Sequence, residues 1–296
     1  MDSLLACALF VAGLAFGSFL NVCISRIPRD LSIVTPPSYC PRCEARIRWR
    51  DNVPLLSWVL LRGRCRTCGA AISWRYPAVE LLTAALFVAS YACCGFTWLG
   101  LRACVFCFLL VGLIFMDAET GLLPHEFTYT GVLAGLASAW LAPFDPSGTL
   151  FLLRVSGLRN VTPGPELWLA DAALAAAIGA GFFYFAWALY YLVRKRDGVG
   201  FGDVALMGMV GAFLGLKLTL LVMFVAPLFA TLVAFGLLFG SRGAWPFAPA
   251  TATPGSAASD SFLARALPFG VFLGGSALIA LFCGARIWTW YLEMFR

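Results

Sequence analysis

Long apolar runs separated by short polar stretches recur along most of the chain. Eight of these runs have the length and hydropathy of membrane-spanning helices. They cover residues 3–25, 77–94, 99–116, 127–144, 168–193, 203–217, 218–240 and 266–285. The polar faces that helices of a soluble core would need are mostly missing from them. The pattern predicts an all-α polytopic membrane protein of about eight transmembrane helices, with a small polar insert after the first.

Composition agrees with this prediction, since 61% of the residues are hydrophobic and 12% are charged. Residues 26–75 hold ten arginines and three acidic residues, a net charge of +7, whereas the whole chain carries +6. Positive charge gathered in one loop indicates the cytoplasmic side of a membrane and not nucleic-acid binding. We therefore expect the N-terminus outside and the insert inside. The expected domains are a first helix (1–25), the insert (26–76) and a helical bundle (77–296).

Two Cys-x-x-Cys pairs lie in the insert, with 21 residues between them. Their members are Cys40, Cys43, Cys65 and Cys68. Each pair can hold one side of a metal ion, and four thiolates complete the tetrahedral shell that zinc prefers. The alternatives are an unmetallated redox pair or chance cysteines in a Cys-rich chain, and a reducing cytoplasm disfavours a disulfide. The spacing predicts one structural zinc ion, with no position left open for a substrate.

Acidic residues near the predicted spans are few, namely Glu80, Asp117, Asp171 and Asp203. Asp117 closes a span just before Gly121 and Pro124, which break the helix, and Asp203 follows Gly-Phe-Gly at a helix start. The expected topology places both aspartates at the cytoplasmic ends of their helices. Asp171 falls at the outer end of its span, where we expect a solvated helix-start residue.

Two carboxylates that face each other across a helical bundle cannot both ionise easily, so they share a proton. Such a pair can activate water and protonate a scissile amide, as in aspartic proteases. A serine protease would depend on the single histidine, His125, or on the two lysines, Lys195 and Lys217, which lie in exposed settings. A proton- or ion-coupled transporter using Asp117 and Asp203 is the alternative from another class. A zinc-bearing membrane scaffold would leave both aspartates unexplained.

Several stretches, in order and spacing, resemble the bacterial type IV prepilin peptidases, which are leader peptidase/N-methyltransferases of the inner membrane. They are FGSFLNVCISRIPRD (16–30), the two cysteine pairs, NVPLLSWVLLRGRCRTCGAAISWRYPAVELLT (52–83), GVGFGDVALMG (198–208) and LPFGVFLGG (267–275). The resemblance implies eight membrane helices, a zinc-bearing cytoplasmic insert and a Gly-x-Gly-Asp aspartic protease. The family's catalytic aspartates fall on Asp117 and Asp203.

The resemblance also implies prepilins or type II secretion pseudopilins as substrates and S-adenosylmethionine as the methyl donor. Glu80 is the acidic residue that we would test for binding this cofactor or the amine; a charge at the headgroup boundary is the other reading. Two positions depart from the family, since His125 stands where Asp or Asn is common and Ala205 where Lys is common. The Pro/Ala/Ser-rich segment 244–261 is expected to be a mobile loop. The oligomeric state stays open.

Overall fold

The computed structural model describes residues 2–156, 162–195, 200–239 and 268–294. Segment 244–261 lies outside these residues. The chain divides into two compact units, Met1–Gly112 and Leu113–Arg296. Helix α4 (Trp98–Thr120) begins in the first unit and ends in the second. Each unit has its own packing.

The first unit is built on α1 (Ser3–Arg26) and α3 (Arg75–Cys94), which pack against each other. Two glycines of α1 let the helix backbones touch. A methyl group at Gly13 would lie 2.5 Å from the Ala84 Cα atom, and one at Gly17 would lie 2.6 Å from the Glu80 Cα atom. Small residues four positions apart permit this close approach between membrane helices.

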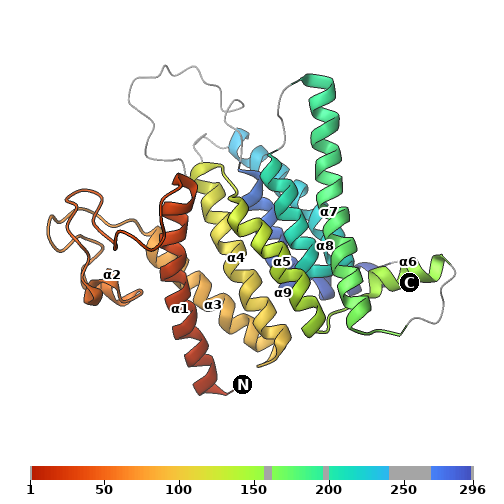
Figure 1. The fold of residues 1–296 in the computed structure, drawn as a ribbon, viewed down its shortest axis with the longest axis horizontal. Coiled ribbons are helices and arrows are strands. Elements are labelled where there is room, and N and C mark those ends of the chain that lie inside the picture. Colours follow the sequence, from red (N-terminus) through yellow and green to blue (C-terminus); the bar gives the residue numbers. More distant parts are fainter. Residues whose placement is uncertain (1, 157–161, 196–199, 240–267, 295–296) are drawn as a thin grey trace. The chain divides into compact units, whose positions relative to one another are not determined.

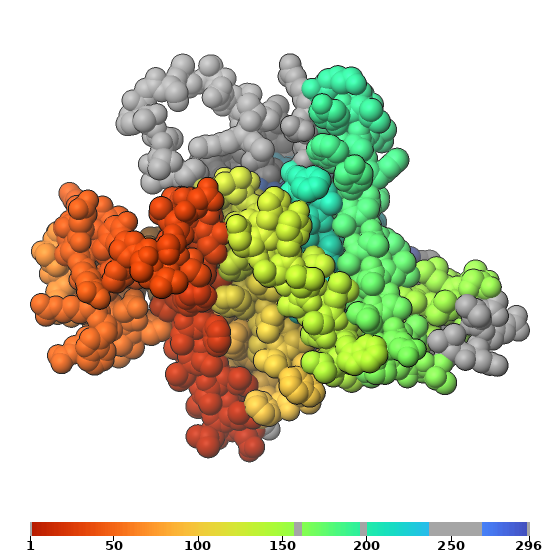
Figure 2. All heavy atoms as spheres, in the orientation of Figure 1, coloured from red at the N-terminus to blue at the C-terminus, as the bar shows by residue number. Residues whose placement is uncertain are grey.

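The insert between α1 and α3 contains only short helices, η1 (Ile27–Arg29), η2 (Trp49–Asn52) and α2 (Leu56–Leu60). In Figure 2 it forms an orange lobe beside the red α1. The Arg66 guanidinium pairs with the Asp51 carboxylate at 2.6 Å, and this hydrogen bond holds the pKa of Asp51 below its usual range. The insert is therefore held by local turns and this ion pair, and several of its large apolar side chains, including Leu56, Val59 and Trp74, stay exposed.

The second unit contains α5 (His125–Leu141), α6 (Ser147–Val155), α7 (Pro165–Arg194), α8 (Phe201–Phe239) and α9 (Phe269–Glu293). Helix α8 packs against α5, α7 and α9 (Figure 1). Most residues from 203 to 216 are buried, so the first half of α8 forms the core of the unit. Many apolar side chains elsewhere on α7 and α8 are exposed, including Phe185, Leu192 and Phe224, as expected for helices that face lipid.

Helix α8 is interrupted at Gly215, whose backbone (φ 73°, ψ 175°) is not helical. The left-handed φ suits glycine, because a Cβ atom is unfavourable there. The sequence predicted a division between two spans near Lys217; the interruption lies two residues earlier, and Lys217 itself is in the helix that follows. The stretch between the predicted spans 127–144 and 168–193 also contains a helix, α6, that the apolar pattern does not show.

Six helices of the described chain are long and apolar enough to cross a membrane: α1, α3, α4, α7, α8 and α9. The all-α, multi-span class is thus confirmed, but the number eight is not. The predicted span at 127–144 corresponds to α5, which has only 17 residues. The two predicted spans at 203–217 and 218–240 lie in α8, which the six include as one helix.

Candidate active site and metal centre

Asp117 lies in the last turn of α4 and is 5% exposed. The carbonyl of Asp117 accepts the Gly121 N–H, and Gly121 takes the left-handed φ of +66° that ends the helix. The Asp117 Oδ2 atom accepts the backbone N–H of Val271 at 3.0 Å. This N–H belongs to the first turn of α9, where backbone donors have no partner within the helix. Asp117 therefore caps α9 from another helix.

Asp203 lies in the first turn of α8 and is 7% exposed. Its N–H donates to the Gly200 carbonyl at 3.0 Å. Leu123 packs close to both helix starts: a methyl group at Gly202 would lie 2.7 Å from the Leu123 Cβ atom, and one at Gly270 would lie 3.1 Å from its Cδ1 atom. The small residues at the starts of α8 and α9 therefore let the loop after α4 approach closely.

The structure brings the two sequence-predicted aspartates together, near enough for the charge of Asp117 to act on the Asp203 carboxylate. Both side chains are buried in the second unit. A charge in this setting is poorly solvated, and two like charges repel, so the pair favours a state with one shared proton. One carboxylate can then accept a proton while the other donates one.

Two contributors to this site were missed by the sequence reasoning, Gly270 and Val271. A methyl group at Gly270 would lie 2.8 Å from the Asp117 Oδ2 atom, so glycine leaves the space that the carboxylate occupies. Both residues lie in the LPFGVFLGG stretch, 153 and 154 residues after Asp117 in the chain. The glycine after Pro-Phe at a helix start indicates a close contact with another part of the chain. The local pattern does not show that the contact is the distant Asp117 carboxylate.

The four predicted zinc ligands come together in the insert, with all four sulfur atoms within 4.8 Å of one another. The Cys40 and Cys68 Sγ atoms are 3.9 Å apart, and those of Cys43 and Cys65 are 4.0 Å apart. Zn–S bonds of about 2.3 Å in a tetrahedron require S···S distances of about 3.8 Å. The donor set and its dimensions therefore fit a four-coordinate metal ion.

The two cysteine pairs have the same local structure. The Glu44 N–H donates to the Cys40 carbonyl, and the Gly69 N–H donates in the same way to the Cys65 carbonyl. Glu44 and Gly69 both take left-handed φ values, 56° and 70°. Backbone N–H groups two and three residues after Cys40 and after Cys65 lower the pKa of each thiol, that of Cys65 to about 6. Such turns favour the thiolate form that binds metal.

Glu80 is 7% exposed and faces the insert from α3. Its Oε2 atom accepts the backbone N–H of Leu55 at 2.8 Å. Leu55 has a φ of +57°, which is unusual for a non-glycine residue, and it precedes α2. Nearby, the Asn21 side chain of α1 donates to the Tyr76 carbonyl at 3.0 Å. Glu80 thus secures the insert, and a sulfonium cofactor would have to compete with this hydrogen bond.

The two positions that depart from the family have different surroundings. His125 is the first residue of α5 and is exposed, with its ring stacked on that of Tyr129 at 5.0 Å. Ala205 is buried two residues after Asp203. A charged side chain at Ala205 would need a partner, whereas the exposed His125 needs none.

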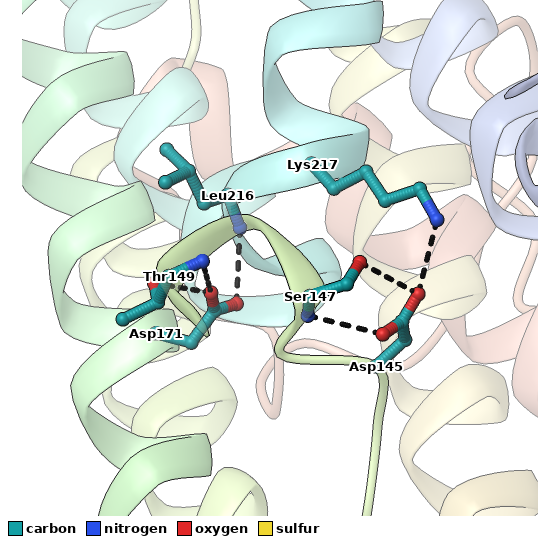
Figure 3. Close-up of polar contacts among 6 residues, drawn as sticks. All are labelled: Asp145, Ser147, Thr149, Asp171, Leu216 and Lys217. Atoms are coloured by element: carbon teal, nitrogen blue, oxygen red, sulfur yellow. Dashed lines mark hydrogen bonds and ion pairs between the residues drawn. The ribbon is translucent and has the colours of Figure 1, made fainter. Parts of the chain in front are cut away.

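The prediction for Asp171 was wrong, because this residue is fully buried and not solvated. Its carboxylate accepts hydrogen bonds from Thr149 and from the Leu216 N–H (Figure 3). Hydropathy placed Asp171 near a span end. The partners lie 22 and 45 residues away in the sequence, so the local pattern gives no sign of them.

Residues 11–94 match the bacterial peptidase A24 N-terminal domain, and residues 104–235 match the type IV leader peptidase family. Over 243 residues the chain is 41% identical to the prepilin leader peptidase/N-methyltransferase of Myxococcus xanthus, covering 82% of this chain and 66% of that protein. It is 32% identical to the Aeromonas hydrophila protein of the same name, covering 97% of this chain and 93% of that protein. No solved structure matches the chain.

These matches cover both units: the first family match contains the four cysteines, and the second contains Asp117 and Asp203. The Aeromonas hydrophila match extends over nearly the whole of both chains. The chain therefore belongs to the type IV leader peptidase family.

Proposed function

We propose that this protein is a membrane-embedded aspartic endopeptidase. Its substrates would be type IV prepilins or type II secretion pseudopilins, cleaved at the cytoplasmic face of the bacterial inner membrane. The observation that carries the proposal is the buried pair of Asp117 and Asp203. Family membership and the printed names of the relatives give the substrate class.

Cleavage by this pair needs one carboxylate and one carboxylic acid. The carboxylate takes a proton from water as the water oxygen attacks the scissile carbonyl carbon. The other member gives its proton to the amide nitrogen as the C–N bond breaks. The products are a carboxylic acid on the leader and a free amine on the mature pilin, and proton exchange with solvent restores the starting state.

The expected topology supports this site of action. The insert is rich in arginine, which indicates the cytoplasmic side, and the apolar faces of the helices indicate lipid contact. A basic leader would stay in the cytoplasm while the apolar stem of the pilin enters the bilayer beside the spans. The scissile bond would then lie at the membrane boundary, where we place the cytoplasmic ends of α4 and α8.

Cleavage of a candidate prepilin in membranes tests the proposal. Asp117→Asn and Asp203→Asn should each lower the rate by at least about 10³-fold, because each removes a group that the step requires. The double variant should be no slower than either single variant, since the two residues act as one unit. Cleavage by either single variant at near the wild-type rate would show that Asp117 and Asp203 are not the catalytic pair. A wild-type protein that does not cleave would instead favour the transporter.

We propose that Cys40, Cys43, Cys65 and Cys68 bind one zinc ion that organises the insert. Metal analysis of the purified protein should give about one zinc per chain. Cys40→Ser and Cys65→Ser should each lose the ion, whereas Cys23→Ser, a buried cysteine of α1, should keep it. Unchanged zinc in the first two variants would contradict the assignment. Cleavage can survive zinc loss, because the aspartates belong to the other compact unit.

We also propose that the protein methylates the new N-terminal amine, with S-adenosylmethionine supplying the methyl group. The names of the relatives carry this proposal. The binding of a cationic group by Glu80 stays a prediction, because its carboxylate already accepts the Leu55 N–H. Methylation of an already cleaved pilin should persist in Asp203→Asn. If Glu80→Gln methylates as wild type does, Glu80 only secures the insert.

A further inference from the structure

Helix α7 and the first half of α8 run antiparallel with their backbones in close contact. A methyl group added to a glycine at any of three points along the pair would collide with the other helix, at 2.3, 2.4 and 2.9 Å. The facing residues are Asp171 and Gly215, Ala175 and Gly211, and Gly179 and Met207. Each pair steps four residues forward in α7 and four residues back in α8.

This regular spacing places Asp171 and Asp203 at opposite ends of one helix pair. The next step along it puts Phe183 of α7 level with Asp203 of α8. About twelve residues separate Asp203 from the interruption at Gly215, which is about 18 Å of helix. A displacement of α8 along its axis at one end is therefore transmitted to the other end.

Small residues allow the two backbones to approach, but they do not fix how far one helix slides along the other. Glycine and alanine have little or no side chain to interlock with the facing helix. A hydrogen bond depends steeply on distance and angle, so it can fix the sliding position. The described α7–α8 contacts provide such a bond at Asp171.

The Asp171 carboxylate binds two other elements at once (Figure 3). Its Oδ2 atom accepts the Leu216 N–H at 3.0 Å, directly after the interruption of α8. Its Oδ1 atom accepts the Thr149 N–H at 3.3 Å and the Thr149 hydroxyl. Leu216 and Thr149 lie in first turns, where backbone donors lack intrahelical partners. One carboxylate thus caps α6 and the second half of α8.

There is little room for this junction to shift. Asp171 is fully buried, and a methyl group at Gly215 would lie 2.3 Å from its Oδ2 atom and 2.6 Å from the Phe144 ring. A second link lies nearer the surface, where Asp145 caps Ser147 and pairs with the Lys217 ammonium at 3.1 Å. The exposed pair is weak by comparison, because water competes for it.

We propose that Asp171 is a positioning residue of the peptidase, which fixes the axial position of α8 and thereby holds Asp203 beside Asp117. The proposal rests on the aspartic-peptidase function proposed above. A misplacement of a catalytic group by about 1 Å can cost about 100-fold in rate, so a junction at the far end of the helix pair has a catalytic effect. A positioning residue of this kind touches neither the substrate nor the reacting atoms.

The test compares Asp171→Asn with wild type and with Asp145→Asn. Asparagine keeps the size of the side chain but turns one acceptor into a donor, which faces an N–H or a hydroxyl that needs an acceptor. We expect kcat for prepilin cleavage to fall at least tenfold per folded molecule, with KM unchanged. Asp145→Asn, made on the exposed link of the same junction, should keep kcat within about twofold of wild type.

The pH profile separates positioning from simple loss of folded protein. Carboxylates that move apart repel less, so they share one proton over a narrower pH range. The alkaline limb of the rate profile should therefore move to lower pH in Asp171→Asn. Gly215→Ala, which intrudes on the same carboxylate, should shift the limb in the same direction. Thermal unfolding and size-exclusion behaviour give the folded fraction, and zinc content shows whether the other compact unit is unaffected.

Two results would overturn the proposal. One is wild-type kcat with an unshifted profile in Asp171→Asn. The other is a loss of activity that matches the lost folded fraction, again with an unshifted profile, which would make Asp171 purely structural. Asp203→Asn is measured in parallel. If Asp203→Asn cleaves normally, the proposed peptidase function fails, whereas an inactive Asp203→Asn beside a normal Asp171→Asn overturns only this inference.

Discussion

Two buried aspartates mark the two ends of the α7–α8 pair, and their surroundings differ. Asp171 accepts three hydrogen bonds, from the Thr149 N–H and hydroxyl and from the Leu216 N–H. Asp203 has the backbone of Gly200 near its carboxylate and the like charge of Asp117 beside it. Both are less than a tenth exposed, so burial alone does not distinguish a structural carboxylate from a chemical one.

The difference lies in the neighbours. The three donors around Asp171 stabilise its charge and fix its position, as expected for a structural carboxylate. A like charge beside Asp203 has the opposite effect, because it favours a shared proton that can move during a reaction. Asp117 combines both features, since it caps α9 through the Val271 N–H and also faces Asp203.

The difference between the structural and the catalytic carboxylates can be tested by crowding Asp117 without changing its charge. This change is expected to have the largest effect on the cleavage rate. Gly270→Ala places a methyl group 2.8 Å from the Asp117 Oδ2 atom. The carboxylate must move, and we expect cleavage to fall about 100-fold. Gly275→Ala on the same helix is the matched control, since a methyl group there meets nothing within 4 Å. Equal activity in the two variants would show that the Asp117–Gly270 contact does not matter for catalysis.

The next contrast concerns stability. Asp171→Asn leaves a buried donor without its acceptor, which costs about 1–3 kcal/mol, so the Tm should fall by several degrees. Asp203→Asn removes a like charge beside Asp117 and should leave the Tm unchanged or raise it, as expected for an active-site residue. Thermal unfolding of both variants in the same detergent checks this. A larger drop in Asp203→Asn than in Asp171→Asn would reverse the assignment of the two roles.

The sequence predicts a feature well when the residues that form it lie close together in the chain, and poorly when they are far apart. The helical class follows from local hydropathy, and the cysteine cluster follows from spacing within one short insert. Asp117 and Asp203 could be paired because a topology argument places both on one side. Asp171 could not be assigned, because its partners lie in α6, which the apolar pattern does not show, and at the Gly215 interruption. The predicted boundary was placed near Lys217, because this residue is charged, and not at Gly215, where the helix is interrupted.

The smallest expected effect concerns Asp145, the exposed counterpart of Asp171 in the same junction. Partial burial alone would raise the pKa of Asp145, but Lys217 and Ser147 outweigh it and hold the pKa below its ordinary value. The stabilisation is therefore present at neutral pH, above the unfolded pKa, and is lost as the pH falls through the folded pKa. Because the Asp145 side chain is 63% exposed, the ion pair contributes at most about 1 kcal/mol.

Asp145→Asn should accordingly lower the Tm at pH 7 by only about 1–3 °C. The difference from wild type should shrink in high salt, which screens an exposed pair. It should also vanish in acid, where the wild-type carboxyl is protonated. If the Tm of Asp145→Asn fell as far as that of Asp171→Asn, the exposed Asp145–Lys217 pair would stabilise the junction as much as Asp171 does. Asp171 would then not be the main contact that fixes the α7–α8 pair at this end.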